Sequence, residues 1–368
     1  DAVASALGVT GFEAEFVGES PATEGDDLTA FHVVHLPPGV SLADALDRFR
    51  ALPEVLEADP IAVLPVSAPP PNDSLFAQQK WMYPWTAPRA DDRILEAWDV
   101  QSGDTAIVVG ILDTGLLAWH PDLGGTGADH GNLFVNWAEA GGVAGVDDDA
   151  NGFVDDVSGW DFVDSLSVPT GEDGRGKDND PSDVAGHGTA VSGIVGAIVN
   201  NTSGIAGMVP NVRLLPVRCA YSTGARPGAG VDMLAAARAI AYATRMGASV
   251  LNCSWESLDQ NGLGAAVNNA VRAGVVFVNA SGNRISSAAY LGQREDVVAV
   301  AGVDTTDVIW SPSTRGTWVD LCAQAVGVTS TFVQGTGPDS LGYRQPDYRA
   351  GLAGTSFAAP QVTGAVAL

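Results

Sequence analysis

The segment AIVVGILDTG at residues 106–115 is the clearest indication of the fold class, because an almost continuous apolar run, Ala106–Leu112, leads directly into Asp113-Thr114-Gly115. A strand without polar alternation is typical of a parallel sheet that is covered on both faces. Similar runs recur at 212–217, 249–253, 275–278 and 297–300, and helical patterns separate them at 187–199, 233–246 and 264–273. This alternation predicts an α/β fold with a mostly parallel sheet and helices on both of its faces.

The first 66 residues have a different pattern. Residues 31–36 predict a strand, Ser41 caps a helix whose apolar residues recur at helical spacing up to Leu52, and 61–66 predict a second strand. A stretch with the successive prolines Pro69–Pro71 follows, and prolines fix φ and remove hydrogen-bond donors. We therefore expect a small domain at 1–66, an exposed and cleavable linker at 67–72, and a large domain at 73–368.

The composition is that of a globular chain, since 46% of the 368 residues are hydrophobic. No apolar run approaches the roughly 18 residues that a membrane helix needs, so no membrane span is expected. The chain starts at Asp1 without the basic and apolar segments of a signal peptide, which we expect to be absent or already removed. It stops at Leu368 inside an apolar helical pattern, so we expect a fragment that is cut at both ends.

The formal net charge of -26 argues against a nucleic-acid partner, because binding to phosphates requires cationic side chains. Cations are the better candidates for ligands, although such a charge also serves solubility alone. Three cysteines, Cys219, Cys253 and Cys322, are widely spaced and odd in number. They predict neither a disulfide framework nor a CxxC metal site, and each is expected to be a small buried apolar residue.

Three segments carry an acid, an imidazole and a hydroxyl at the ends of predicted elements. Asp113 follows the first strand, His187 stands in Gly186-His187-Gly188-Thr189, and Ser356 stands in the segment 354–360, GTSFAAP. A serine hydroxyl needs a histidine to remove its proton, and the imidazolium so formed needs a carboxylate to orient and stabilise it. Taken singly, the three residues also fit a turn, a helix cap and an ordinary serine. Asp-Thr-Gly occurs in aspartic peptidases too, but a second such motif is missing from the sequence.

In the order Asp, His, Ser these segments resemble the subtilisin-like serine peptidases, over about residues 72 to 368. The resemblance implies a three-layer α/β/α fold around a mostly parallel, seven-stranded sheet. It also implies that Ser356 attacks the peptide carbonyl, that His187 acts as general base and then acid, and that Asp113 holds the imidazole. Asn283 matches the asparagine that donates to the oxyanion in this family, together with the backbone N–H of Ser356.

The sequence departs from the family pattern in the serine motif and in the walls of the primary specificity pocket. Phe357 and Gln361 stand where a methionine and a histidine are common, and Ser254-Trp255-Glu256-Ser257 stands where the family commonly has Ser-Leu-Gly-Gly. We hypothesise that Glu256 narrows the pocket or biases it toward basic P1 residues, unless it simply points into solvent. The other expected substrate contacts are Ala280, Ser281, Gly282 and, as a sheet edge for the substrate backbone, Gly228, Ala229 and Gly230.

An acidic loop at 147–156 predicts a calcium site, because oxygen-bearing residues alternate there with a glycine at the sixth position, as in chains that curl around a hard cation. Position twelve is Ser158, so the glutamate of an EF-hand is missing and no EF-hand helix pair is expected. A solvated acidic turn is the alternative. The expected ligands are Asp147, Asp149, Asn151, the carbonyl of Phe153, and Asp155.

A second calcium site follows only from the resemblance. Thermitase-like members of the family hold calcium between an Asp near the mature N-terminus, the Asp of a His-Pro-Asp-Leu segment and an asparagine-rich loop. In this sequence the implied ligands are Asp73, Asp122 and Asn201, with the carbonyls of Ile198, Ser203 and Ile205. Ca²⁺ is therefore the expected cofactor, and no organic cofactor is expected.

Residues 31–66 resemble the inhibitory propeptide of the same family, a small ferredoxin-like α/β domain. The sequence is accordingly interpreted as a secreted, monomeric serine endopeptidase that acts on protein or peptide substrates and carries its own propeptide as an intramolecular inhibitor. Two alternatives stay open. One is a non-catalytic calcium-binding adhesion or binding module on a peptidase fold, and the other is an acidic calcium-binding structural protein that would not need Ser356.

Overall fold

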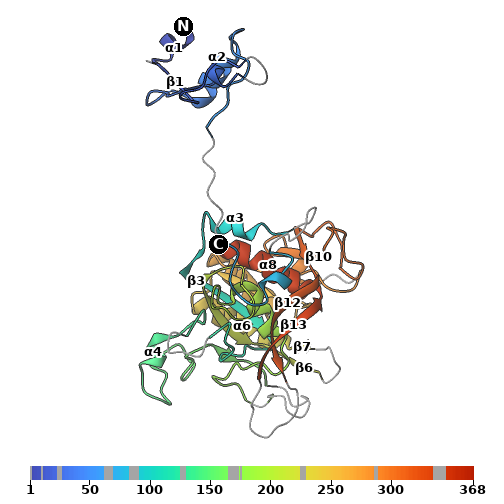
Figure 1. Ribbon diagram of the computed structural model, residues 1–368. Coiled ribbons are helices and arrows are strands. Elements are labelled where there is room, and N and C mark those ends of the chain that lie inside the picture. The colour runs from blue at the N-terminus through green and yellow to red at the C-terminus, as the bar shows by residue number, and fades with distance from the viewer. Residues whose placement is uncertain are drawn as a thin grey trace. The chain divides into compact units, whose positions relative to one another are not determined.

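The computed structural model describes residues 2–9, 11–22, 27–61, 69–82, 91–124, 130–164, 174, 176–223, 229–285, 289–334 and 345–368. The chain divides into two compact units, Asp1–Val66 and Ser67–Leu368. Both units are shown in Figure 1. Among the described helices, none is long and apolar enough to cross a bilayer.

The smaller unit contains a two-stranded antiparallel sheet of β1 (Phe12–Ala14) and β2 (His32–Val34), with α1 (Ala2–Ala6), η1 (Leu28–Ala30) and α2 (Leu42–Arg50). Ser41 caps α2 by accepting a hydrogen bond from the backbone N–H of Asp44, as its sequence predicts. Leu7, Ala45 and Phe49 form a small core. The strand predicted at 61–66 lies, after its first residue, outside the described residues.

A seven-stranded parallel sheet forms the centre of the larger unit, as the resemblance implied. Its strand order is β11-β10-β9-β8-β3-β5-β4. The strands are β3 (Gly103–Asp113), β4 (Trp160–Asp161), β5 (Asn211–Arg218), β8 (Val250–Cys253), β9 (Val276–Ala280), β10 (Val298–Val303) and β11 (Leu321–Gln324). Because all seven are parallel, their carboxyl ends lie at one edge of the sheet.

Helices cover both faces of this sheet, which gives three layers. On one face α5 (His187–Gly196) and α8 (Thr355–Ala367) pack against alternate strand residues such as Val109 and Ile111. On the other face α6 (Met233–Arg245) and α7 (Leu263–Arg272) pack against Val108 and Leu112. Side chains alternate between the faces along a strand, so the continuous apolar run of β3 supplies both cores.

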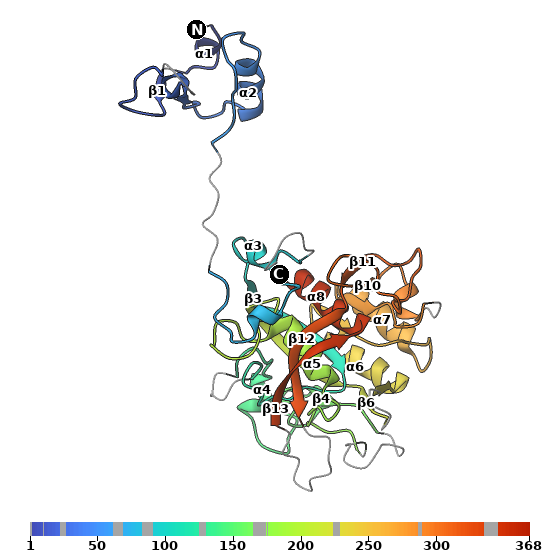
Figure 2. The same cartoon turned by 45° about the vertical axis from the view of Figure 1, so that its right-hand side comes forward.

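Two antiparallel hairpins lie outside the sheet. One consists of β12 (Val326–Gln334) and β13 (Gln345–Ala353), whose long strands run side by side in Figure 2, and the other of β6 (Ala220–Ser222) and β7 (Ala229–Val231). The remaining short helices are η2 (Phe76–Gln78), α3 (Ile94–Trp98), α4 (Trp137–Ala140) and η3 (Leu291–Gln293).

The predicted burial of the cysteines is confirmed for Cys219 and Cys253. It is wrong for Cys322, which is exposed on the edge strand β11.

Candidate active site

Asp113 and His187 meet at the carboxyl edge of the sheet. Asp113 is the last residue of β3, and His187 is the first residue of α5. The two backbones approach closely, because a Cβ atom on Gly188 would overlap the carbonyl oxygen of Gly115. Gly115 itself has φ +105°, a left-handed conformation that favours glycine. The glycines of both motifs are therefore what allows the acid and the imidazole to come together.

A short hydrogen bond joins the two side chains, with 2.7 Å between His187 Nδ1 and Asp113 Oδ1. The side chain of Asp113 is 2% exposed and that of His187 29% exposed, so the carboxylate is shielded from solvent while part of the imidazole is accessible. Burial lowers the pKa of His187, but the charge of Asp113, the hydrogen bond to it and the charge of Asp183 together raise that pKa above its ordinary value. The arrangement favours protonation of the imidazole during a reaction.

Asp183 links the segment that contains Asp113 to the segment that contains His187. The sequence did not suggest this role. Asp183 is fully buried, and burial raises its pKa while hydrogen bonds oppose the rise. Its Oδ1 accepts from Thr114 Oγ1 at 2.9 Å and from the N–H of Gly186 at 2.8 Å. Its Oδ2 accepts from the N–H and the hydroxyl of Thr189 at 2.9 and 2.7 Å. The signal in the sequence was an aspartate four residues before His187.

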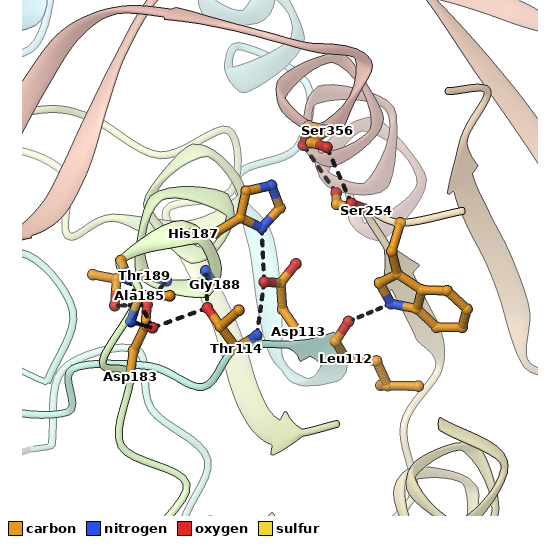
Figure 3. A network of polar contacts seen from close by, with 12 residues as sticks. Leu112, Asp113, Thr114, Asp183, Ala185, His187, Gly188, Thr189, Ser254 and Ser356 are labelled. Carbon is orange, nitrogen blue, oxygen red and sulfur yellow. Dashed lines mark hydrogen bonds and ion pairs between the residues drawn. The ribbon is translucent and has the colours of Figure 1, made fainter. Parts of the chain in front are cut away.

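Ser356 is the second residue of α8, on the other side of the imidazole. Figure 3 shows the ring of His187 between Asp113 and Ser356. In this structure Ser356 Oγ donates to the carbonyl oxygen of Ser254 at 3.0 Å, and Ser254 Oγ donates to the carbonyl oxygen of Ser356 at 2.9 Å. Among the described residues no hydrogen bond joins Ser356 to His187. A rotation of the serine side chain is needed before its proton can pass to Nε2.

Asn283 lies beside the start of α8 with a fixed amide orientation. Its Oδ1 accepts from the backbone N–H of Thr355 at 2.9 Å and from its hydroxyl at 3.1 Å. Because a backbone N–H can only donate, the atom facing it must be the oxygen, and Nδ2 is left available as a donor. The N–H of Ser356, in the first turn of α8, also lacks a partner within the helix. Two donors are thus present next to the serine hydroxyl.

The two segments expected to line the specificity pocket extend from adjacent strands, β8 and β9. Trp255 is 8% exposed and donates from Nε1 to the carbonyl oxygen of Leu112 at 2.7 Å, whereas Glu256 is exposed. In the facing segment Ala280, Ser281 and Gly282 are buried. Gln361 is buried away from the reacting side chains and pairs with the backbone of Gln324.

The predicted edge for the substrate backbone is only partly described. Gly228 lies outside the described residues, whereas Ala229 and Gly230 belong to β7 and pair with Ser222 and Tyr221 of β6.

The acidic loop brings together a carboxylate cluster that differs from the predicted ligand set. Oxygens of Glu139, Asp149 and Asp156 lie within 4.8 Å of one another. Asp149 was predicted, but Glu139 and Asp156 were not. The other two predicted carboxylates accept hydrogen bonds from nearby backbone N–H groups. Asp147 accepts from Asn151 and Gly152, whereas Asp155 accepts from Gly145. Asn151 Oδ1 accepts from the N–H of Phe153, whose carbonyl was the fifth expected ligand. Glu139 had no signal in the sequence, because it precedes the loop on α4.

The residues of the second expected calcium site lie close together. Asp122 is fully buried, and its carboxylate accepts from Asn201 Nδ2 and from the N–H of Ile205, each at 2.8 Å. Asp73 accepts from the N–H of Asn201 at 3.2 Å. Burial raises the pKa of Asp122 to about 6 and also raises that of Asp73. Ile198 donates to the carbonyl oxygen of Asp122, and Ser203 donates to Asn201 Oδ1.

Tyr348 is a neighbour of this cluster that the sequence reading missed. Its hydroxyl lies 3.4 Å from Ser203 Oγ, and its ring packs edge-on against His120. The strand β13 that carries it lies far along the chain, so no local pattern linked it to Asp122.

An acid, an imidazole and a serine hydroxyl at the carboxyl edge of a parallel sheet, next to two N–H donors, are the groups of a triad serine hydrolase. The model of the subtilase family matches residues 104–368. The chain therefore belongs to the subtilase family of serine endopeptidases.

Three similar proteins illustrate this membership. A thermophilic serine proteinase of Bacillus sp. (strain AK1) is 36% identical over 74% of this chain, and thermitase of Thermoactinomyces vulgaris is 32% identical over 81%. The chain spans 54% of the length of the first and 84% of the second. In the solved structure of proteases from Pseudoalteromonas arctica PAMC 21717, the similarity covers 82% of this chain and 86% of that one, with a TM-score of 0.63 and 27% identity.

Proposed function

We propose that this chain hydrolyses peptide bonds of protein substrates through a covalent acyl-enzyme intermediate. Ser356 Oγ attacks the carbonyl carbon while His187 Nε2 takes its proton, and Asp113 stabilises the imidazolium that forms. Asn283 Nδ2 and the N–H of Ser356 donate to the oxygen that becomes negative. His187 then protonates the leaving amine, and a water molecule deacylates Ser356 by the same steps. The observation that carries the proposal is the 2.7 Å hydrogen bond between Asp113 and His187 beside Ser356.

A fluorophosphonate probe tests this proposal directly, because it labels a serine only when a base has activated the hydroxyl. We expect labelling of the full chain and its loss in Ser356→Ala. Ser254→Ala is the matched control, since it removes the neighbouring hydroxyl and leaves the carbonyl oxygen to which Ser356 donates. Labelling that survives in Ser356→Ala would contradict the assignment. An unlabelled wild-type chain would favour a non-catalytic binding module instead.

Calcium fits two places in the larger unit. Two buried carboxylates, Asp73 and Asp122, repel each other and are poorly solvated, and a divalent cation would offset both effects. Asn201 and the carbonyls of Ile198, Ser203 and Ile205 would complete that site. In the acidic loop, the carboxylates of Glu139, Asp149 and Asp156 are the best-placed ligands. Hard oxygen ligands suit Ca²⁺, whose part here is to neutralise charge and fix loops.

We further propose that residues 1–66 act as an inhibitory propeptide, that cleavage falls within 67–72, and that the protein is secreted and monomeric. The division of the chain into two compact units supports the first point, and the successive prolines before Asn72 support the second. Secretion is consistent with loops suited to the millimolar calcium found outside cells.

A further inference from the structure

The side chain of Glu256 lies between the two segments that leave the sheet beside Ser356. The strands β8 and β9 are paired in parallel with Cys253 opposite Asn279, so the residues after them emerge side by side. The first segment contacts the nucleophile, since the carbonyl oxygen of Ser254 accepts from Ser356 Oγ. The second contacts the residue before it, since the N–H of Gly282 donates to Thr355 Oγ1 at 3.2 Å. Both segments therefore flank the reacting hydroxyl.

The backbone is fixed on both sides of Glu256. The carbonyl oxygen of Trp255 accepts from Asn279 Nδ2 at 2.9 Å, and the indole of Trp255 is anchored to Leu112. On the other side, Ser257 Oγ accepts from the N–H of Leu291 at 2.9 Å. Because the backbone is held at Trp255 and Ser257, movement of Glu256 is limited to its side chain. Rotation of the side chain alone keeps the carboxylate within a side-chain length of the facing segment.

That carboxylate reaches the facing segment. The position that a Cβ atom would take on Gly282 lies 3.1 Å from Glu256 Oε1 and 3.6 Å from its Cγ. The facing backbone at Gly282 is itself held, because its carbonyl oxygen accepts from the N–H of Thr314 at 2.9 Å. Among the residues that the structure describes, Glu256 has no hydrogen-bonding or ion-pair partner. An exposed carboxylate thus lies next to Gly282 of the facing segment.

We propose that Glu256 determines the substrate class by binding the side chain of a lysine or arginine at P1, the residue whose carbonyl Ser356 attacks. The inference rests on the proposed peptidase function. The P1 side chain is attached to the Cα atom that is bonded to the attacked carbonyl carbon. It must therefore enter beside Ser356, where the two segments and Glu256 lie. A large apolar side chain entering there would desolvate an unpaired carboxylate, which is unfavourable. A cationic side chain would form a charge-assisted hydrogen bond with it.

Peptides that differ only at P1 test the proposal. The full chain is first incubated in calcium-containing buffer until its hydrolytic activity no longer changes with time. We compare P1 arginine with citrulline, its neutral isostere, and with leucine and phenylalanine. We expect kcat/KM for arginine to exceed that for citrulline by about ten- to a hundredfold, the range for one hydrogen bond to a charged group. Glu256→Gln keeps the size of the side chain without its charge and should abolish the preference. Because Glu295 precedes β10, at the opposite edge of the sheet, Glu295→Gln is the matched control and should retain it.

Other outcomes overturn the inference in distinguishable ways. Equal hydrolysis of arginine and citrulline peptides, or an arginine preference that persists in Glu256→Gln, would mean that the charge is not recognised. If Glu256→Gln resembles the wild type and only Glu256→Ala gains activity on phenylalanine and leucine, the side chain merely narrows the cleft. Hydrolysis of none of the peptides, together with no fluorophosphonate labelling, would overturn the proposed function and the inference with it.

Discussion

Asn283 is oriented by Thr355, the residue before the nucleophile. Thr355 directs both its N–H and its hydroxyl at Asn283 Oδ1, so Nδ2 is turned away from Thr355 and remains available. The residue that orients the amide is also the residue before the nucleophile, so donor and hydroxyl share one rigid support at the start of α8. Preorganised donors of this kind stabilise charge that develops in the transition state.

Replacing Asn283 by alanine should therefore lower kcat and leave KM nearly unchanged. We expect a fall of about 10²–10³-fold, as is typical when one oxyanion donor is removed. Steady-state kinetics on a single peptide substrate, with active sites counted by titration, measures the change. The control is Asn268→Ala on α7, an asparagine that pairs with Arg294 instead. An unchanged kcat would remove Asn283 from the proposed mechanism.

Asp183 should act on catalysis through His187 as a positioning residue. The base must be neutral to accept a proton, so kcat/KM should rise with pH through the pKa of His187, which lies above the ordinary 6.5. The charge of Asp183 contributes to that upward shift, so Asp183→Asn should move the rise to lower pH. The variant should also lose hydrogen bonds that Asp183 accepts from Thr114 and Thr189. Because these bonds position the imidazole, kcat should fall by about ten- to a hundredfold.

A pH profile of kcat/KM for wild type and Asp183→Asn, normalised to titrated active sites, separates the two roles. If Asp183 only supported folding, the variant would give fewer active sites with the same profile, and a midpoint that does not move would contradict the electrostatic part. Asp232→Asn is the matched control, because Asp232 caps α6 rather than facing the imidazole.

At the scale of elements, the sheet could be predicted from the sequence because its strands are buried on both faces and read as apolar runs. The β12–β13 hairpin gives no such pattern. Its buried residues Ser330 and Thr331 are polar, and their hydroxyls donate to carbonyl oxygens of α5, those of Ala190 and Thr189, at 2.6 and 2.7 Å. Such pairing joins residues about 140 positions apart, which propensity and periodicity do not report.

The same limit applies to the site. Motif order and spacing predicted Asp113, His187 and Ser356 as catalytic residues, because each motif carries its own glycines and stands at the end of an element. Glu139 and Tyr348 gain their significance only from contacts made by folding, and for Asp183 the sequence shows no more than its position four residues before His187. Glu256 is recognisable in the sequence as an unusual residue type at an expected pocket wall, and its distance to Gly282 in the structure locates its carboxylate.

Calcium removal should destabilise the segment around Asp122 in a pH-dependent way. A carboxyl whose pKa is raised to about 6 disfavours the folded state once it is charged, and this penalty is absent below its unfolded value of 3.8 and complete above about 6. Bound calcium would offset the penalty. A chelator should therefore lower Tm by about 5–10 °C at pH 8 and by less at pH 5.

Thermal melts with and without chelator at the two pH values give the comparison. In Asp122→Asn the chelator effect should shrink, whereas in Asp149→Asn, within the acidic loop, the part due to Asp122 should remain. A Tm that does not respond to chelator at either pH would exclude calcium from both places.

The chain consists of two compact units and carries a strongly negative formal net charge of -26. The large unit contains every residue of the proposed mechanism, so the first 66 residues are not needed for the chemistry itself. A unit with its own small core that precedes a proline-rich stretch is well suited to be removed by cleavage of that stretch.

Removal of residues 1–66 could be carried out by the chain itself through Ser356. If the chain processes itself, purified wild-type protein should yield a fragment beginning within 67–73, and Ser356→Ala should stay intact, because cleavage requires the nucleophile. Gel analysis with N-terminal sequencing identifies the cut, and Ser254→Ala is again the control that should still be processed. A cleavage rate per molecule that does not depend on protein concentration indicates an intramolecular reaction, whereas conversion of Ser356→Ala by added wild-type enzyme indicates cleavage between molecules. Processing of Ser356→Ala alone would assign the cut to a different protease and separate the two units functionally.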